Sequence, residues 1–185
     1  MKKHTKQLTA LLDELEVKYI DRGDDCLGIT IATDNYVDHA DGSKSLLIVA
    51  YVDTERKIVR LSAINCIDLA SCDHREKVSQ LLLWMNFQSD LPRFELDLTD
   101  HEVRCAVSTS YGESFVDAGQ LDKMLSSLIK AVDANWEIVE EALKTGKLPD
   151  ALYEKHQRLE LADLIRAAGG VEGLREILSE RGLIN

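Results

Sequence analysis

Residues 74–143 constrain the fold of this chain most, because the periodicity of their apolar residues changes twice. Over residues 74–87 the apolar side chains recur at helical spacing. Residues 93–98 and 103–107 instead alternate apolar with polar side chains, which predicts the two strands of a β-hairpin. An apolar stripe at helical spacing then runs along residues 118–143, about seven turns. The stretch therefore predicts a helix, a hairpin and one long helix.

The N-terminal half of the sequence adds a helix and three strands. Residues 5–17 carry four leucines at helical spacing, and after a turn at residues 23–25 the alternation at 27–31 predicts a half-buried strand. Residues 46–52 are apolar on both faces, which is typical of a central strand covered on both sides. Residues 59–63 continue the meander. The fold class that follows is α+β, an antiparallel β-sheet (meander plus hairpin) flanked by helices.

The sequence beyond Gly146 differs in kind from the preceding part, and it predicts a short helical C-terminal extension. One short helix is expected around residues 159–165, and Gly169-Gly170 separates it from a second. The second helix carries an apolar face made of Val171, Leu174, Ile177 and Leu178. We expect an α+β domain at residues 1–145 and a helical extension at residues 146–185.

Net charge sets limits on the partners of this chain. The 185 residues carry a net charge of −11, with 22 basic and 33 acidic side chains. A field of that sign repels phosphate backbones, so nucleic-acid binding is disfavoured, whereas basic partners are attracted. The only early basic cluster, Lys2, Lys3 and Lys6, is short and lacks interleaved aromatic residues.

The hydropathy pattern predicts a cytoplasmic protein. The longest apolar run, residues 46–52, has the length of a strand and is too short to cross a membrane. The N-terminal residues lack the apolar core of a signal peptide. The four cysteines are scattered, and without export they are expected to be reduced thiols.

The residues that could carry chemistry do not form a recognisable motif. Cys66, Cys72 and His74 come nearest to a metal site but contain no Cys-x-x-Cys pair. The acidic loop around Asp38 has the wrong residues for an EF-hand, and Ser114 lacks the glycine of a nucleophile elbow. No catalytic residue, metal or cofactor is therefore expected. An enzyme would require a polar cluster in a cleft, and Cys72, His74 and an aspartate around one cavity would make an enzyme the leading interpretation.

Three segments of the chain resemble the YbjN-domain family, which is related to the type III secretion chaperone-like fold. They are the stretch Leu81-Leu82-Leu83-Trp84-Met85-Asn86, the hairpin Phe94–Leu98 with Glu102–Val107, and the helix Leu121–Leu143. Within them Asn86, Phe94 and Asp133 lie at positions typical of the pattern, which spans roughly residues 5–144. The resemblance implies a helix-flanked antiparallel sheet, a homodimer, and a role in holding or adapting other proteins without catalysis.

Two apolar surfaces are the candidate partner interfaces. Trp84 and Phe87 lie off the main stripe of the 74–87 helix, so this helix is apolar around much of its circumference. Such a helix is either sandwiched between the sheet and another helix or faces a partner subunit. Exposed apolar patches are uncommon on monomers, which favours burial. The second surface is the face of Val171, Leu174, Ile177 and Leu178, which packs on the sheet of its own domain or docks elsewhere.

The function predicted from these patterns is a non-enzymatic, cytoplasmic protein-binding module. It would act as an adaptor or chaperone-like regulator, as a homodimer, through groove or strand-edge contact with a partner segment. The alternative is a small-molecule-binding sensory or regulatory domain that holds its ligand in a pocket between the sheet and the long helix.

Overall fold

The computed structural model describes residues 3–23, 25–152 and 165–180 of the chain. The chain divides into two compact units, residues 1–147 and residues 148–185. In the second unit the predicted helix at 171–178 is observed as α6 (Val171–Glu180). Most of the helix expected around residues 159–165 lies outside the described residues. Among the described residues, no helix combines the length and apolar character needed to cross a membrane.

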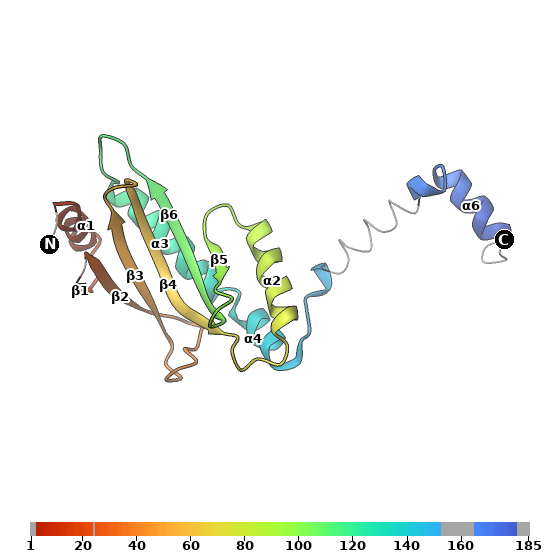
Figure 1. Ribbon diagram of the computed structural model, residues 1–185, viewed down its shortest axis with the longest axis horizontal. Helices are drawn as coiled ribbons and strands as arrows, with labels where there is room; N and C mark the ends of the chain where they lie inside the picture. The colour runs from red at the N-terminus through yellow and green to blue at the C-terminus, as the bar shows by residue number, and fades with distance from the viewer. Residues whose placement is uncertain (1–2, 24, 153–164, 181–185) are drawn as a thin grey trace. The chain divides into compact units, whose positions relative to one another are not determined.

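The first unit is built on a six-stranded antiparallel sheet in the order β1-β2-β3-β4-β6-β5 (Figure 1). The strands are β1 (Tyr19–Gly23), β2 (Cys26–Ala32), β3 (Ser45–Asp53), β4 (Ile58–Asp68), β5 (Arg93–Leu96) and β6 (Glu102–Ser110). A meander of four strands is extended by the β5–β6 hairpin, because β6 pairs with β4. The predicted fold class, an α+β sheet flanked by helices, is confirmed.

Helices cover one face of this sheet. They are α1 (Lys3–Glu14), α2 (Arg75–Gln88), α3 (Ala118–Asp133) and α4 (Trp136–Thr145). The helix α1 contacts β3, and α3 contacts β4 and β6, while α2 lies beside β5 and α4. In Figure 1 the strands pass in front of α3. The core between the layers contains fully buried side chains such as Leu8, Ile48, Leu61 and Leu121, each worth roughly 2 kcal/mol of burial free energy.

The strand β1 was not predicted from the sequence. Four of its five residues are exposed, so its sequence shows no alternation of apolar and polar side chains. It forms by antiparallel pairing with β2, in which Ile20 lies opposite Gly28. Hydrogen bonding to a neighbouring strand, rather than side-chain burial, therefore defines this edge of the sheet.

The prediction of one long helix over residues 118–143 was wrong. The helix α3 ends at Asp133, and α4 begins at Trp136. At the break, the Asn135 side-chain amide donates to the Ala131 carbonyl at 2.9 Å. The apolar stripe continues through the break because Trp136 and Val139 are buried as well. Side-chain periodicity reports which residues face inward, and it does not register a short interruption of the backbone hydrogen bonds.

The expectation that β3 is covered on both sides was also wrong. Its residues alternate strictly between buried and half-buried. Leu46, Ile48 and Ala50 point into the core, whereas Leu47 and Val49 point to the opposite face. No helix of the described residues contacts that opposite face, which is therefore an open surface with apolar side chains.

The start of α3 carries a capping box. The Gln120 amide donates to the Asp117 carboxylate at 2.7 Å, and the Asp117 amide donates to the Gln120 side chain at 3.1 Å. Replacing Asp117 with alanine is expected to lower the free energy of unfolding by about 1 kcal/mol, because one N-terminal amide of the helix loses its acceptor. Urea denaturation measures this. Asp122→Ala, on the exposed surface of the same helix, is the control, and equal stability of the two variants would contradict the capping role.

Candidate functional site

The helix α2 presents large apolar side chains on two sides. Val78, Leu81 and Met85 are buried against the rest of the unit. Leu83 and Phe87, one turn apart, are 69% and 74% exposed. The expected burial of this helix inside the monomer therefore does not extend to Phe87. Leu83 was not singled out from the sequence, because it lies inside an apolar run whose outward-facing members cannot be identified by spacing alone.

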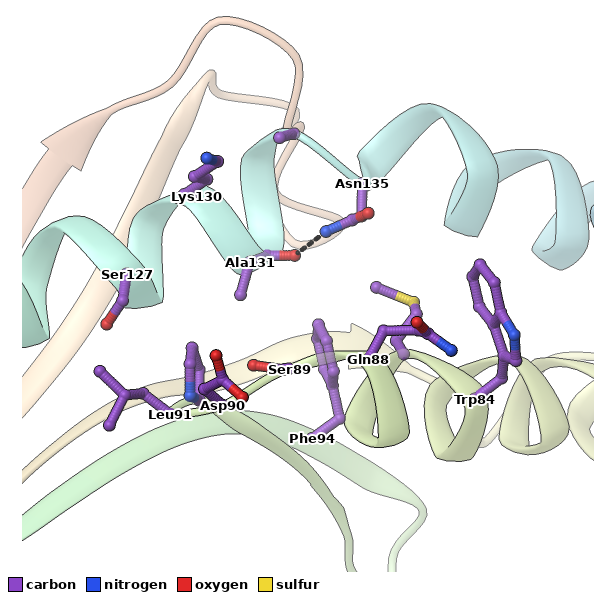
Figure 2. Close-up of a pocket in the computed structure, with 13 residues that line it drawn as sticks. Trp84, Gln88, Ser89, Asp90, Leu91, Phe94, Ser127, Lys130, Ala131 and Asn135 are labelled. Carbon is purple, nitrogen blue, oxygen red and sulfur yellow. Dashed lines mark hydrogen bonds between the residues drawn. The ribbon is translucent and has the colours of Figure 1, made fainter. Parts of the chain in front are cut away.

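A groove lies beside this exposed face, between α2 with the α2–β5 loop and α3 (Figure 2). It has a volume of about 490 Å³. Its apolar lining comes from Trp84, Met85, Leu91, Pro92 and Phe94 on one wall and from Ala131 and Ala134 on the other. In Figure 2 the ring of Phe94 rises from the lower wall toward the end of α3, and the ring of Trp84 rises toward α4. Of the two candidate residues on α2, Trp84 is half-buried and lines this groove. Phe87 lies on the adjacent exposed face of the helix.

The side chain of Asn86 closes the edge of the sheet next to the groove. Its amide nitrogen donates to the Phe94 carbonyl at 2.9 Å, and its oxygen accepts from the Phe94 amide at 2.7 Å. These two hydrogen bonds replace the donor and the acceptor that the backbone of a neighbouring strand would provide to β5. An unpaired edge strand is a template for pairing with another chain, so Asn86 blocks strand addition at Phe94.

Asp133, at the end of α3, holds the loop between β2 and β3. Its carboxylate accepts hydrogen bonds from the Asn35 and Tyr36 amides, both at 2.8 Å, and from the Asp34 amide at 3.4 Å. Burial opposes ionisation of this carboxyl group, but these amides and the charge of Lys44 together place its pKa below the ordinary value. The Tyr36 ring is buried and meets Trp136 edge to face, with ring centroids 4.7 Å apart.

Cys72 and His74 do line one cavity, of about 260 Å³, together with Asp68 and Asp73. The Cys72 thiol donates to the Leu143 carbonyl at 3.8 Å, and the Asp68 carboxylate accepts from the Ala70 amide at 2.8 Å. Within the part of the chain that the structure describes, no hydrogen bond joins Cys72, His74 and an aspartate. A catalytic cysteine needs a base within hydrogen-bond reach, so proximity here is not accompanied by the pairing that such chemistry requires.

The His74 ring instead packs against the end of α4. Gly146 has a φ of +70°, and a Cβ there would lie 2.8 Å from His74 Nδ1. The glycine therefore serves both the left-handed end of the helix and the close approach of the imidazole.

Two further thiols are buried in the core, and the carboxylates of the acidic loop accept hydrogen bonds from backbone amides of that loop. Cys66 and Cys105 are buried, and burial raises the pKa of the Cys66 thiol to about 12. In the acidic loop, the Asp38 and Asp41 carboxylates accept from the Ala40 and Ser43 amides, both at 2.8 Å. Across the described residues, no group of three or more His, Cys, Asp or Glu side chains is placed to hold a metal ion.

The second candidate surface lies on α6, in the second compact unit of the chain. Val171 is 52% exposed and Leu178 is half-buried. Leu174 and Ile177 belong to the same helix, and their side chains lie outside the described residues.

Comparison with known proteins places the fold. No protein-family model and no curated protein matches the sequence. Among solved structures, the E. coli protein YbjN aligns with a TM-score of 0.50 at 14% sequence identity, covering 70% of this chain and 89% of that chain. A chain of the HopA1–SchA chaperone–effector complex aligns with a TM-score of 0.47 at 12% identity, covering 72% of this chain and 96% of that chain. With its six-stranded antiparallel sheet and flanking helices, this chain has a YbjN-like fold.

Proposed function

We propose that this chain is a non-enzymatic protein-binding module that acts in the cytoplasm as an adaptor or chaperone-like regulator, as a homodimer. The observation that carries the proposal is the exposed apolar pair Leu83 and Phe87, next to a groove lined by Trp84 and Phe94. Exposed apolar surface costs free energy in water unless a partner covers it.

The two parts of this surface suit two kinds of contact. The face of Leu83 and Phe87 lies on one helix, α2, and it can meet the same face of a second copy across a two-fold axis. The groove, with aromatic walls, suits a large apolar side chain of a partner segment. Asn86 occupies the β5 edge, so partner contact at this end uses side chains and the groove instead of strand addition at Phe94.

The proposal gives residues 146–185 the role of a helical extension. Val171, Leu174, Ile177 and Leu178 recur at helical spacing along α6, and they would provide a second contact face.

Replacing Phe87 with glutamate is expected to abolish self-association while leaving the melting temperature nearly unchanged. The side chain is 74% exposed, so the new charge costs little in the monomer but is desolvated in an interface. Light scattering after size exclusion gives the oligomeric state, and thermal denaturation gives the stability. Trp84→Glu is expected to lower both self-association and the melting temperature, because Trp84 is half-buried.

Ile138→Glu, at a 37% exposed position on α4, is the matched control and is expected to keep the wild-type assembly. If the double variant Leu83→Glu/Phe87→Glu has the same mass in solution as the wild type, this face is not the subunit interface.

The alternative is a small-molecule-binding regulatory domain, and the groove is what favours it. A volume of about 490 Å³ lies within the usual range for ligand sites. Native mass spectrometry of the gently purified protein separates the two functions. A co-purifying polypeptide supports the binding module, whereas a small additional mass together with ligand-dependent stabilisation supports the sensor.

A further inference from the structure

The helix α2 carries a projecting apolar side chain and a groove next to each other. Phe87 is 74% exposed, and Trp84, three residues earlier on the same helix, lines the groove of about 490 Å³. Residues three apart lie about 60° from each other around a helix axis, so the two rings leave α2 on neighbouring sides. A projection beside a recess allows two identical surfaces to fit into each other across a two-fold axis.

The exposed apolar pair alone is too small for a stable dimer. An aromatic side chain buries about 150–250 Å², whereas a standard interface covers about 800 Å² of each partner. Phe87 and Leu83 together supply only part of that area. A dimer formed through this face must therefore extend onto neighbouring surface. The groove is the adjacent surface with apolar walls, which include Trp84 and Phe94.

Opposite charges lie on the two sides of the groove. Asp90, just beyond the end of α2, lines one wall, and Lys130 on α3 lines the other (Figure 2). Both side chains are exposed, and among the described residues neither forms an ion pair. A two-fold axis that brings Asp90 of one copy to Lys130 of a second copy also brings the reverse pair together. The surface is therefore complementary to itself in charge.

The same arrangement places an aromatic ring where the groove can accept it. Phe87 and Asp90 lie three residues apart, so a copy that directs Asp90 toward Lys130 of another copy also brings Phe87 to its groove. On the α3 wall the lining residues Ala131 and Ala134 are small, which leaves room for a ring. On the other wall the aromatic side chains offer the edge or offset contacts that a ring prefers.

We propose that the groove is filled by Phe87 of a second copy of this chain, reciprocally across a two-fold axis, with Asp90 of each copy paired with Lys130 of the other. This inference rests on the proposed homodimer and adds what occupies the groove. Each groove is then incomplete in the single chain. In the dimer, any further partner binds outside the groove.

The test is a charge exchange in the full chain, measured by sedimentation velocity and native mass spectrometry. In a homodimer, Asp90→Lys places a lysine against Lys130 at both contacts, and Lys130→Asp places an aspartate against Asp90 at both. Each variant alone is expected to self-associate about tenfold more weakly, because two exposed charge pairs change from attraction to repulsion. An equimolar mixture of the two variants is expected to form a heterodimer of about wild-type affinity, since both contacts then join a lysine and an aspartate. Lys123→Asp, exposed on α3 and outside the groove, is the charge control.

A further variant tests the groove itself. Ala134 is exposed and lines the α3 wall, so Ala134→Trp places a ring in the groove without altering the core. It is expected to weaken self-association at least tenfold, the effect of losing a central aromatic anchor, while the melting temperature stays at the wild-type value. Ser126→Trp, exposed on α3 outside the groove lining, is the matched control and is expected to keep the wild-type assembly.

Thermal melting of each variant confirms that it is folded. A mixture that associates no more tightly than either charge variant alone, or a dimer of wild-type affinity from Ala134→Trp, would overturn the inference. If Phe87→Glu nevertheless dissociates that dimer, the proposed function stands and only the groove contact is wrong. A wild-type chain that stays monomeric at every concentration would overturn both the groove contact and the proposed homodimer.

Discussion

Replacing Asp133 with alanine is expected to lower the free energy of unfolding by about 3 kcal/mol. The carboxylate accepts two well-formed hydrogen bonds, from the Asn35 and Tyr36 amides at 2.8 Å, and a longer one from Asp34. Hydrogen bonds to a charged acceptor each contribute about 1.5–3 kcal/mol. The loss also releases the loop that seats the buried ring of Tyr36 against Trp136.

The position of Asp133 in its helix supports this interpretation. A negative charge at the C-terminal end of a helix is disfavoured by the helix dipole, so Asp133 destabilises α3 locally. The amides of the β2–β3 loop offset that cost. The carboxylate therefore stabilises the tertiary fold through a contact about a hundred residues away in sequence.

The contribution of Asp133 is expected to depend on pH. Its pKa in the folded protein is below the ordinary value of about 4, so the stabilisation is complete above pH 4 and is lost as the pH falls through the folded pKa. The stability difference between wild type and Asp133→Asn should therefore be largest at neutral pH and shrink below pH 4. Urea denaturation at pH 7 and pH 3 measures it, with the exposed Asp122→Asn as control. A difference that does not change with pH would exclude the charged carboxylate as its source.

Replacing Asn86 with alanine is expected to lower the free energy of unfolding by about 2 kcal/mol and to promote self-association through β5. The Phe94 amide and carbonyl lose the partners that hold them at 2.7 and 2.9 Å. Each lost hydrogen bond costs about 1 kcal/mol, and the open edge becomes available to a strand of another chain.

Asn86→Asp provides an internal comparison, because a carboxylate still accepts from the Phe94 amide but cannot donate to its carbonyl. Its stability is expected to lie between those of wild type and Asn86→Ala. Gln88→Ala, two residues along the same helix and exposed, is the control. Urea denaturation and sedimentation velocity are the measurements. A monodisperse Asn86→Ala variant as stable as Gln88→Ala would show that the β5 edge does not depend on this side chain.

Several features of the fold followed from sequence patterns because each depends on neighbours in the chain. The strands at 27–31, 46–52 and 59–63 alternate or are apolar throughout. β1 could not be predicted in this way, because it is exposed and its structure comes from pairing with β2.

The candidate surface was predictable only in part. The apolar excess of the 74–87 helix singled out Trp84 and Phe87, but spacing could not show that Phe87 is exposed and Trp84 lines a groove. Asn86 and Asp133 were noted as positions typical of the YbjN pattern. The hydrogen bonds that they make connect parts of the chain that only the folded structure brings together.

By itself the sequence determined the fold class, the approximate place of five of the six strands, and the net charge of −11, because these depend on composition and on short-range periodicity. Only the tertiary structure decided which face of the sheet is open and where α3 gives way to α4. The register of neighbouring strands determines which side chains share a face, and that register depends on contacts between residues far apart in the chain.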